Sequence, residues 1–134
     1  MIVLVVDASV LVVALADDGA DGDGARARLR GERLVAPELV DLEVGSVLRR
    51  QAAAGHIDDR RATTALQDLI ALPLQRARHV ALLNRCWELR TNLTFYDAAY
   101  VALAEALPTT LLTGDRRLAK APGATCHFEV FTPN

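Results

Sequence analysis

The sequence predicts an α/β domain in which helices pack against a parallel β-sheet. Short apolar segments alternate along the chain with longer segments of helical pattern, an order typical of parallel sheets with helical crossovers. The first apolar segment, Ile2 to Val6, is an unbroken aliphatic run, as expected of a strand covered on both faces. The chain has 134 residues, so we expect one domain, residues 1–134, with a substantial buried core.

Turn and cap residues divide the first half of the chain into elements. Asp7 to Ser9 offers helix-start residues after the first strand, and Gly31 stops a short helix. Pro37 suits the first turn of a long helix, because its missing N–H has no partner there, and Gly55 suits the position after the last turn. The expected elements are a strand at 2–6, a helix at 10–16, a surface loop at 17–24, a helix at 25–30, a strand at 33–36 and a helix at 37–54.

The second half continues the alternation. Asp58 and Asp59 start a helix, and Pro108 ends the last long one. The expected elements are helices at 58–72, 79–90 and 96–107, strands at 73–77, 110–113 and 128–131, and a helical turn at 115–120. Helices outweigh strands in this arrangement.

Composition and charge limit the kinds of partner and compartment. The formal net charge of −2 argues against a protein that coats nucleic acid in general, so any nucleic-acid contact must be local. Cys86 and Cys126 have no metal or redox spacing and are expected to be buried thiols, and the histidines lack zinc-ligand spacing. The apolar segment 1–16 has no basic start and is too short to cross a bilayer, so we expect a cytoplasmic protein with no membrane contact.

Two aspartates follow predicted parallel strands. Asp7 comes directly after the first strand, and Asp115 follows the strand at 110–113 across Gly114. The carboxyl ends of parallel strands meet at one edge of an open sheet, where such folds bind their ligands. Taken alone, each aspartate also fits a cap for the helical turn that follows it.

Two further acids are expected on buried helices. On the helix at 37–54, Glu43 falls between Val47 and Leu39 around the helical wheel, inside the apolar arc. A carboxylate there must reach the edge or find a partner, and an arginine is the structural alternative. Asp97 lies in the first turn of a helix that is apolar around its circumference, where the helix dipole favours a carboxylate in any case.

Together the four acids indicate a site for a divalent cation. If they converge, their charges repel one another and raise their pKa values, and a hard cation such as Mg²⁺ or Mn²⁺ removes that repulsion. One or two such ions can activate a water toward a phosphodiester, so no nucleophilic side chain is needed. The sequence has no P-loop and no Ser–His pair. We expect Asp7 and Asp97 to be the strongest ligands, because rigid element starts place them.

Four segments, in the right order and spread over nearly the whole chain, carry a resemblance to a known family: Val5–Ser9, Leu42–Leu48, Tyr96–Ala104 and Leu112–Leu118. They resemble PIN-domain proteins and, more closely, the VapC-type toxins of bacterial toxin–antitoxin pairs. The resemblance implies a PIN-like three-layer α/β/α sandwich with a central parallel β-sheet.

The resemblance also implies an activity and site residues. It implies a Mg²⁺- or Mn²⁺-dependent endoribonuclease, the toxin of a type II toxin–antitoxin pair, with the acidic roles on Asp7, Glu43, Asp97 and Asp115. Ser9 and Thr113 match supporting polar positions, for which an ordinary capping or strand-end hydroxyl is the alternative. Arg116 and Arg117, beside Asp115, are candidates for contacts to RNA phosphates, with a solvated surface as the alternative.

The implied partners are an RNA substrate, a second copy in a homodimer, and a VapB-type antitoxin whose tail lies across the active-site groove. Operator DNA is reached only through the antitoxin. The sequence alone names neither the RNA nor the antitoxin, and homodimerisation rests on the resemblance.

Three other functions compete with this interpretation. A receiver-like phosphoacceptor domain needs adjacent acids after its first strand, but this chain has one acid there, and its one lysine, Lys120, follows the Asp115 turn. A catalytically silent PIN-like binding module is disfavoured because all four acids are present, and a flap-processing DNA nuclease usually needs a longer chain. Trp87 is expected in the core or a dimer interface, and Asp41 is expected to face solvent.

Overall fold

The computed structural model describes residues 3–133 and confirms the α/β/α sandwich. The expected strand start at Ile2 lies outside the described residues. The strands are β1 (Val3–Val6), β2 (Arg33–Pro37), β3 (Leu74–Ala77), β4 (Thr110–Thr113) and β5 (His127–Val130). The helices are α1 (Ala8–Ala16), α2 (Ala20–Leu29), α3 (Leu39–Ala53), α4 (Asp59–Ala71), α5 (Leu83–Glu88) and α6 (Phe95–Ala106), with 3₁₀ turns at Val80–Leu82 and Leu118–Lys120.

The five strands form one parallel sheet in the order β3-β2-β1-β4-β5. β1 lies at the centre, where Val5 pairs with Val35 on one side and Leu111 on the other. Leu4 and Val5 are almost completely buried, as expected of a strand that helices cover on both faces. The order reverses between β1 and β4, which makes the carboxyl ends of these two strands the topological switch point of the sheet.

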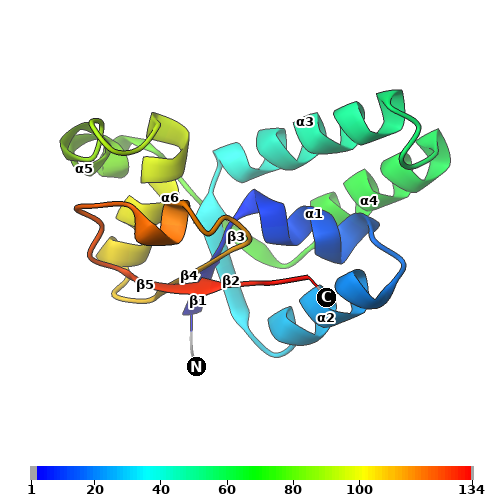
Figure 1. Ribbon diagram of the computed structural model, residues 1–134, viewed down its shortest axis with the longest axis horizontal. Coiled ribbons are helices and arrows are strands. Elements are labelled where there is room, and N and C mark those ends of the chain that lie inside the picture. The colour runs from blue at the N-terminus through cyan, green and yellow to red at the C-terminus, as the bar shows by residue number, and fades with distance from the viewer. Residues whose placement is uncertain (1–2, 134) are drawn as a thin grey trace.

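Helices form the outer two layers (Figure 1). From β1 through β2 to β3 the chain moves toward one edge of the sheet, and α1 to α4, which connect these strands, cover one face. α5 and α6 connect β3 to β4 and cover the other face. α6 contacts β1, β2 and β4 on its inner side and α5 on its outer side, whereas α1 packs against α2, α3 and α4. This double covering explains why residues 98–104 of α6 are all buried.

The glycine-rich segment at 17–24 is not a loop throughout, because α2 already begins at Ala20. A Cβ on Gly22 would lie 1.8 Å from the backbone oxygen of Asp17, so the first turn of α2 lies directly against the chain that leaves α1. The Asp17 side chain accepts hydrogen bonds from the N–H groups of Gly19 and Gly22. Glycine is therefore needed here for a close backbone approach, a role that composition does not distinguish from that of a flexible loop.

The expectation that Pro37 lies in the first turn of a helix is wrong. It is the last residue of β2, in register with Ala77, and α3 begins at Leu39. The pairing with β3 continues past the proline, since the N–H of Glu38 donates to the oxygen of Ala77. The helix expected at 79–90 is divided into the 3₁₀ turn at Val80–Leu82 and α5. His79 lies just before the 3₁₀ turn. Its Nε2 accepts a hydrogen bond from the N–H of Leu39, so His79 caps α3.

Three smaller expectations need correction. Asp41 does not simply face solvent, because the Arg76 guanidinium donates to both of its oxygens. Trp87 was expected in the core or a dimer interface, and its 59% exposure excludes the core; it touches Phe95 edge-on. Of the two free thiols, Cys86 is buried as expected and Cys126 is only partly buried.

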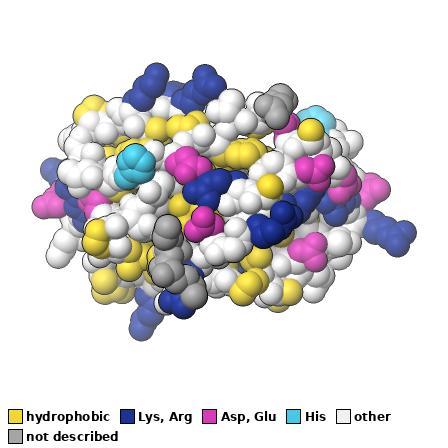
Figure 2. All heavy atoms as spheres, turned by 90° about the horizontal axis from the view of Figure 1, so that it is seen from below, with side chains coloured by type: hydrophobic (Ala, Val, Ile, Leu, Met, Phe, Trp, Pro, Cys, Tyr) yellow, Lys and Arg dark blue, Asp and Glu magenta, His cyan; other side chains and the backbone are white. Residues whose placement is uncertain are grey.

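The surface agrees with a nearly neutral protein. On the face shown in Figure 2, basic and acidic side chains are mixed and do not form one continuous basic patch. Among the described residues, no helix is both long and apolar enough to pass through a bilayer.

Candidate active site at the carboxyl ends of β1 and β4

Asp7 lies where β1 ends and α1 begins. Its N–H donates to the oxygen of Leu112, so the pairing between β1 and β4 extends to this residue. Asp7 occupies the N-cap position of α1, but its side chain makes no capping hydrogen bond. Instead, Asp7 is only 9% exposed, and its Oδ2 accepts hydrogen bonds from two hydroxyl groups. The carboxylate is therefore turned toward the switch point of the sheet and away from the backbone of its own helix.

The two hydroxyl groups belong to Thr113 and Ser9, the supporting residues expected from the sequence. Thr113 Oγ1, on a fully buried side chain at the end of β4, donates to Asp7 Oδ2 at 2.7 Å and accepts from the N–H of Asp115 at 3.0 Å. Ser9 Oγ donates to the same Asp7 oxygen at 3.1 Å and accepts from the N–H of Gly114 at 2.9 Å. Together they tie the end of β1 to the residues that follow β4.

Glu43 reaches the site from α3. It is half-buried at the edge of the helix face formed by Val40, Val44 and Leu48, as the helical wheel indicated. Its Oε1 accepts a hydrogen bond of 2.6 Å from Tyr100 Oη, so its bonding partner is a phenol and not the alternative arginine. Burial raises the pKa of Glu43, the Tyr100 bond lowers it, and the charges of Asp7 and Asp97 raise it further, with a net increase.

Asp97 is the third residue of α6 and comes from the opposite face of the sheet. Thr94, not Asp97, caps this helix, because Thr94 Oγ1 accepts from the N–H of Asp97. Burial raises the pKa of Asp97, and the charges of Asp7 and Asp115 raise it further, against smaller opposing effects of Thr94 and Arg117. Asp97 is thus close enough to both strand-end aspartates to be repelled by them.

Asp115 has a structural function in addition to its place near Asp97. Its Oδ1 accepts from the N–H groups of Arg117 and Leu118, so it caps the turn after β4, as the structural alternative predicted. Arg116 and Arg117 are exposed on this turn. Arg117 lies near enough to Asp97 to lower its pKa, which places one of the two candidate phosphate-binding arginines beside the acidic cluster.

The sequence did not single out Tyr100, yet it links α6 to Glu43. The signal was present, because tyrosine is the one residue with a polar group in the apolar stretch 98–104. A buried phenol needs a hydrogen-bond acceptor. The sequence contained no indication that the acceptor would be Glu43, 57 positions away.

The acidic residues suit a hydrated hard cation. Within residues 3–133, no three His, Cys, Asp or Glu side chains gather tightly enough to hold an ion by themselves. Mg²⁺, however, keeps several waters and commonly takes one or two carboxylates together with substrate phosphate oxygens. The donors here are carboxylates, and burial, together with the charges of neighbouring acids, raises the pKa values of Glu43 and Asp97, an effect that a cation would offset. Asp7, Glu43, Asp97 and Asp115 therefore fit Mg²⁺ or Mn²⁺ as a group.

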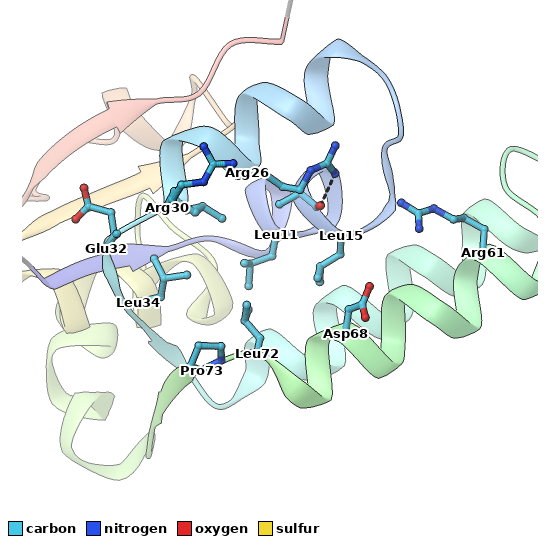
Figure 3. A pocket seen from close by; sticks show the side chains of 13 residues that line it. Leu11, Leu15, Arg26, Arg30, Glu32, Leu34, Arg61, Asp68, Leu72 and Pro73 are labelled. Carbon is cyan, nitrogen blue, oxygen red and sulfur yellow. Dashed lines mark hydrogen bonds between the residues drawn. The ribbon is translucent and has the colours of Figure 1, made fainter.

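A separate groove of about 500 Å³ lies between α1, α2 and α4 (Figure 3). Leu11, Leu15, Leu34 and Leu72 point toward one another in its centre. Charged side chains surround these leucines: Arg26, Arg30, Glu32, Arg61 and Asp68. The groove is thus an apolar channel with a mixed charged rim, and it includes none of the four candidate acids.

Comparison with known proteins identifies the family. A model of the PIN domain matches residues 4–124. Ribonuclease VapC1 of Mycobacterium tuberculosis is 46% identical over 127 residues, which cover 94% of this chain and 96% of that protein. The crystal structure of PAE2754 from Pyrobaculum aerophilum is similar with a TM-score of 0.68 and 28% identity, covering 96% of this chain and 84% of the other.

A second solved structure shows the same fold at lower identity. VapBC2 from Rickettsia felis, bound to a DNA fragment from its promoter, has a TM-score of 0.71 at 14% identity and covers 98% of this chain and all (100%) of the other. The family model extends across the segment from Asp7 to Asp115. The chain therefore belongs to the PIN-domain family and, within it, to the group of the VapC-type toxins.

Proposed function

We propose that this chain is a Mg²⁺- or Mn²⁺-dependent endoribonuclease and the toxin of a type II toxin–antitoxin pair. One observation carries the proposal: carboxylates from the end of β1, from α3, from α6 and from the turn after β4 lie at the switch point of the sheet, where burial and the charges of neighbouring acids raise the pKa values of Glu43 and Asp97. A fold gains no stability from placing these charges together, so the arrangement suits cation binding. The similarity to a protein named as a ribonuclease supports RNA as the substrate.

The chain's own residues position the reaction. Thr113 and Ser9 hold the Asp7 carboxylate, and Thr94 holds the first turn of the helix that carries Asp97. The chemistry supplied by Mg²⁺ or Mn²⁺, when bound, is activation of a water and stabilisation of the leaving oxygen of a phosphodiester. Asp7 and Asp97 are the principal ligands in this proposal, with Glu43 and Asp115 acting directly or through water.

RNA binding is assigned to a local surface. Arg116 and Arg117 lie on the exposed turn beside Asp115, where guanidinium groups can bind phosphates on either side of the scissile bond. The net charge of −2 and the mixed surface of Figure 2 favour short contacts near the cut over binding along a long RNA.

A VapB-type antitoxin and a second copy of the chain are the proposed protein partners. The groove of Figure 3 has a leucine-lined centre and a charged rim, which suits an amphipathic segment of the antitoxin. The exposed apolar side chains Val80, Leu83, Trp87 and Phe95 on α5 and its flanks offer a surface for the homodimer. Operator DNA is bound through the antitoxin in this proposal.

The proposal is tested by incubating a pool of cellular RNAs with purified protein freed of any partner. Parallel reactions contain Mg²⁺, Mn²⁺ or EDTA, and a further set uses Asp97→Asn. We expect discrete cuts that require the metal and disappear in the variant. A folded, partner-free protein that binds Mn²⁺ but cuts no RNA would instead identify the catalytically silent binding module.

A further inference from the structure

We propose that Tyr100 is a positioning residue of the acidic site, and that its hydroxyl group holds Glu43 in place through Oε1 while leaving the negative charge of the carboxylate available to a cation. The inference rests on the proposed function and assigns a task to a residue that does not touch the substrate. It starts from the 2.6 Å hydrogen bond between Tyr100 Oη and Glu43 Oε1.

The placement of Tyr100 makes it a rigid support. Its side chain is fully buried, so its ring is fixed by the surrounding core. It lies one helical turn after Asp97 on α6, and residues three apart share a helix face. One helix therefore places the Asp97 carboxylate directly and the Glu43 carboxylate through a hydrogen bond.

Glu43 needs such a support. It is half-buried on α3 and is repelled by both Asp7 and Asp97. Glutamate has a flexible side chain, and a half-buried position at the edge of a helix leaves it a route to solvent. The Tyr100 bond opposes the repulsion and keeps Glu43 facing Asp7 across the switch point.

The chemical type of the donor matters as much as its position. Elsewhere in the chain, carboxylates that tie elements together are paired with arginines: Glu105 with Arg85, Glu129 with Arg28, and Asp41 with Arg76. An arginine neutralises the carboxylate that it holds. At the acidic site the donors to Glu43 and Asp7 are neutral hydroxyl groups, from Tyr100 to Glu43 and from Thr113 and Ser9 to Asp7. These donors orient the carboxylates without supplying a competing positive charge.

The test compares Mn²⁺ binding by four proteins: wild type, Tyr100→Phe, Glu43→Gln and the double variant. Tyr100→Phe removes one oxygen atom and keeps the ring that fills the core. Outer-shell partners of ligands typically contribute about 10–100-fold to metal affinity, so we expect Tyr100→Phe to weaken Mn²⁺ binding about tenfold. In the Glu43→Gln background, the same change should have almost no further effect.

Two controls separate positioning from folding. Tyr96→Phe removes a hydroxyl group from an exposed tyrosine of the same helix and should leave Mn²⁺ affinity unchanged. Thermal unfolding of the metal-free proteins checks that each variant is folded. In RNA cleavage at saturating Mn²⁺, Tyr100→Phe should lower kcat more than it changes KM, because its effect is on the acidic site and not on RNA contacts.

The other possible results overturn either the role of Tyr100 or the proposed function. Unchanged Mn²⁺ affinity in folded Tyr100→Phe, or a loss of equal size with and without Glu43, overturns the positioning role of Tyr100. Wild-type protein that shows no metal-dependent cleavage refutes the proposed function itself. An active wild type with an unaffected Tyr100→Phe variant refutes only the inference about Tyr100.

Discussion

Replacing Thr113 with valine should disconnect the two strand ends that form the acidic site. Valine has nearly the same shape and suits a β-strand, so the substitution removes hydrogen bonds and leaves packing almost unchanged. Two bonds are lost: the one donated to Asp7 Oδ2 at 2.7 Å and the one accepted from the N–H of Asp115 at 3.0 Å. Because the Thr113 side chain is fully buried, water has no direct access to the space next to the new methyl group.

The expected loss of stability follows from these two bonds. A hydrogen bond to a charged group contributes about 1.5–3 kcal/mol and a neutral one about 1 kcal/mol, so the sum is about 2.5–4 kcal/mol. Asp7 keeps its bond from Ser9, which places the expected value near the lower end, at about 2.5–3 kcal/mol. Cleavage of RNA should fall as well, because Asp7 is no longer held by two donors.

Urea unfolding of wild type and Thr113→Val in the presence of EDTA measures this change without any contribution from metal binding. Thr64→Val serves as the matched control, since Thr64 lies exposed on α4, and it should change stability by no more than about 0.5 kcal/mol. A Thr113→Val variant that loses less than about 1 kcal/mol would show that the Thr113 hydroxyl does not hold the strand ends together.

Four further variants test other parts of the structure. Glu43→Gln and Asp97→Asn should be at least as stable as wild type at pH 7.5. The raised pKa of each carboxyl group stabilises the fold below its unfolded pKa of about 4, and this stabilisation is lost as pH rises through the pKa of the folded state. Urea unfolding should therefore favour the amide variants at pH 7.5 and show no difference near pH 3.5. A wild type that is clearly more stable than both amides at pH 7.5 would contradict the assigned repulsion. His79→Ala should cost about 1 kcal/mol in thermal unfolding, because the first turn of α3 loses its hydrogen-bond acceptor, and an unchanged Tm would exclude this cap. Gly22→Ala should lower the free energy of unfolding by about 2 kcal/mol or more, since the added Cβ would lie 1.8 Å from a backbone oxygen. Urea unfolding followed by circular dichroism measures this change, and an unchanged stability would show that α2 shifts freely.

The strand-end part of the site was predictable from sequence. Asp7 and Asp115 each follow an apolar strand, and parallel strands end at one edge of the sheet, so their neighbourhood follows from the order of the elements. The supporting place of Thr113 came from the family resemblance and not from this argument. Asp97 was predictable as a first-turn residue of a buried helix, although Thr94 is the actual cap.

Other predictions failed where two distant segments meet. Pro37 continues β2 because β3 is there to pair with it, and Asp41 is paired because Arg76 approaches from β3. α2 begins early because Gly22 fits against the end of α1. A helical wheel or a turn preference describes one segment at a time and includes none of these contacts.

The sequence by itself determined the alternation of elements, the parallel sheet and the identity of the candidate acids, because each depends on burial patterns and turn residues within a few positions. Only the tertiary structure decided which donors hold those acids. Thr113 reaches Asp7 across 106 positions and Tyr100 reaches Glu43 across 57. Hydrogen bonds depend on distances of about 3 Å between side chains, and only the packing of α3 and α6 against the sheet brings such atoms together.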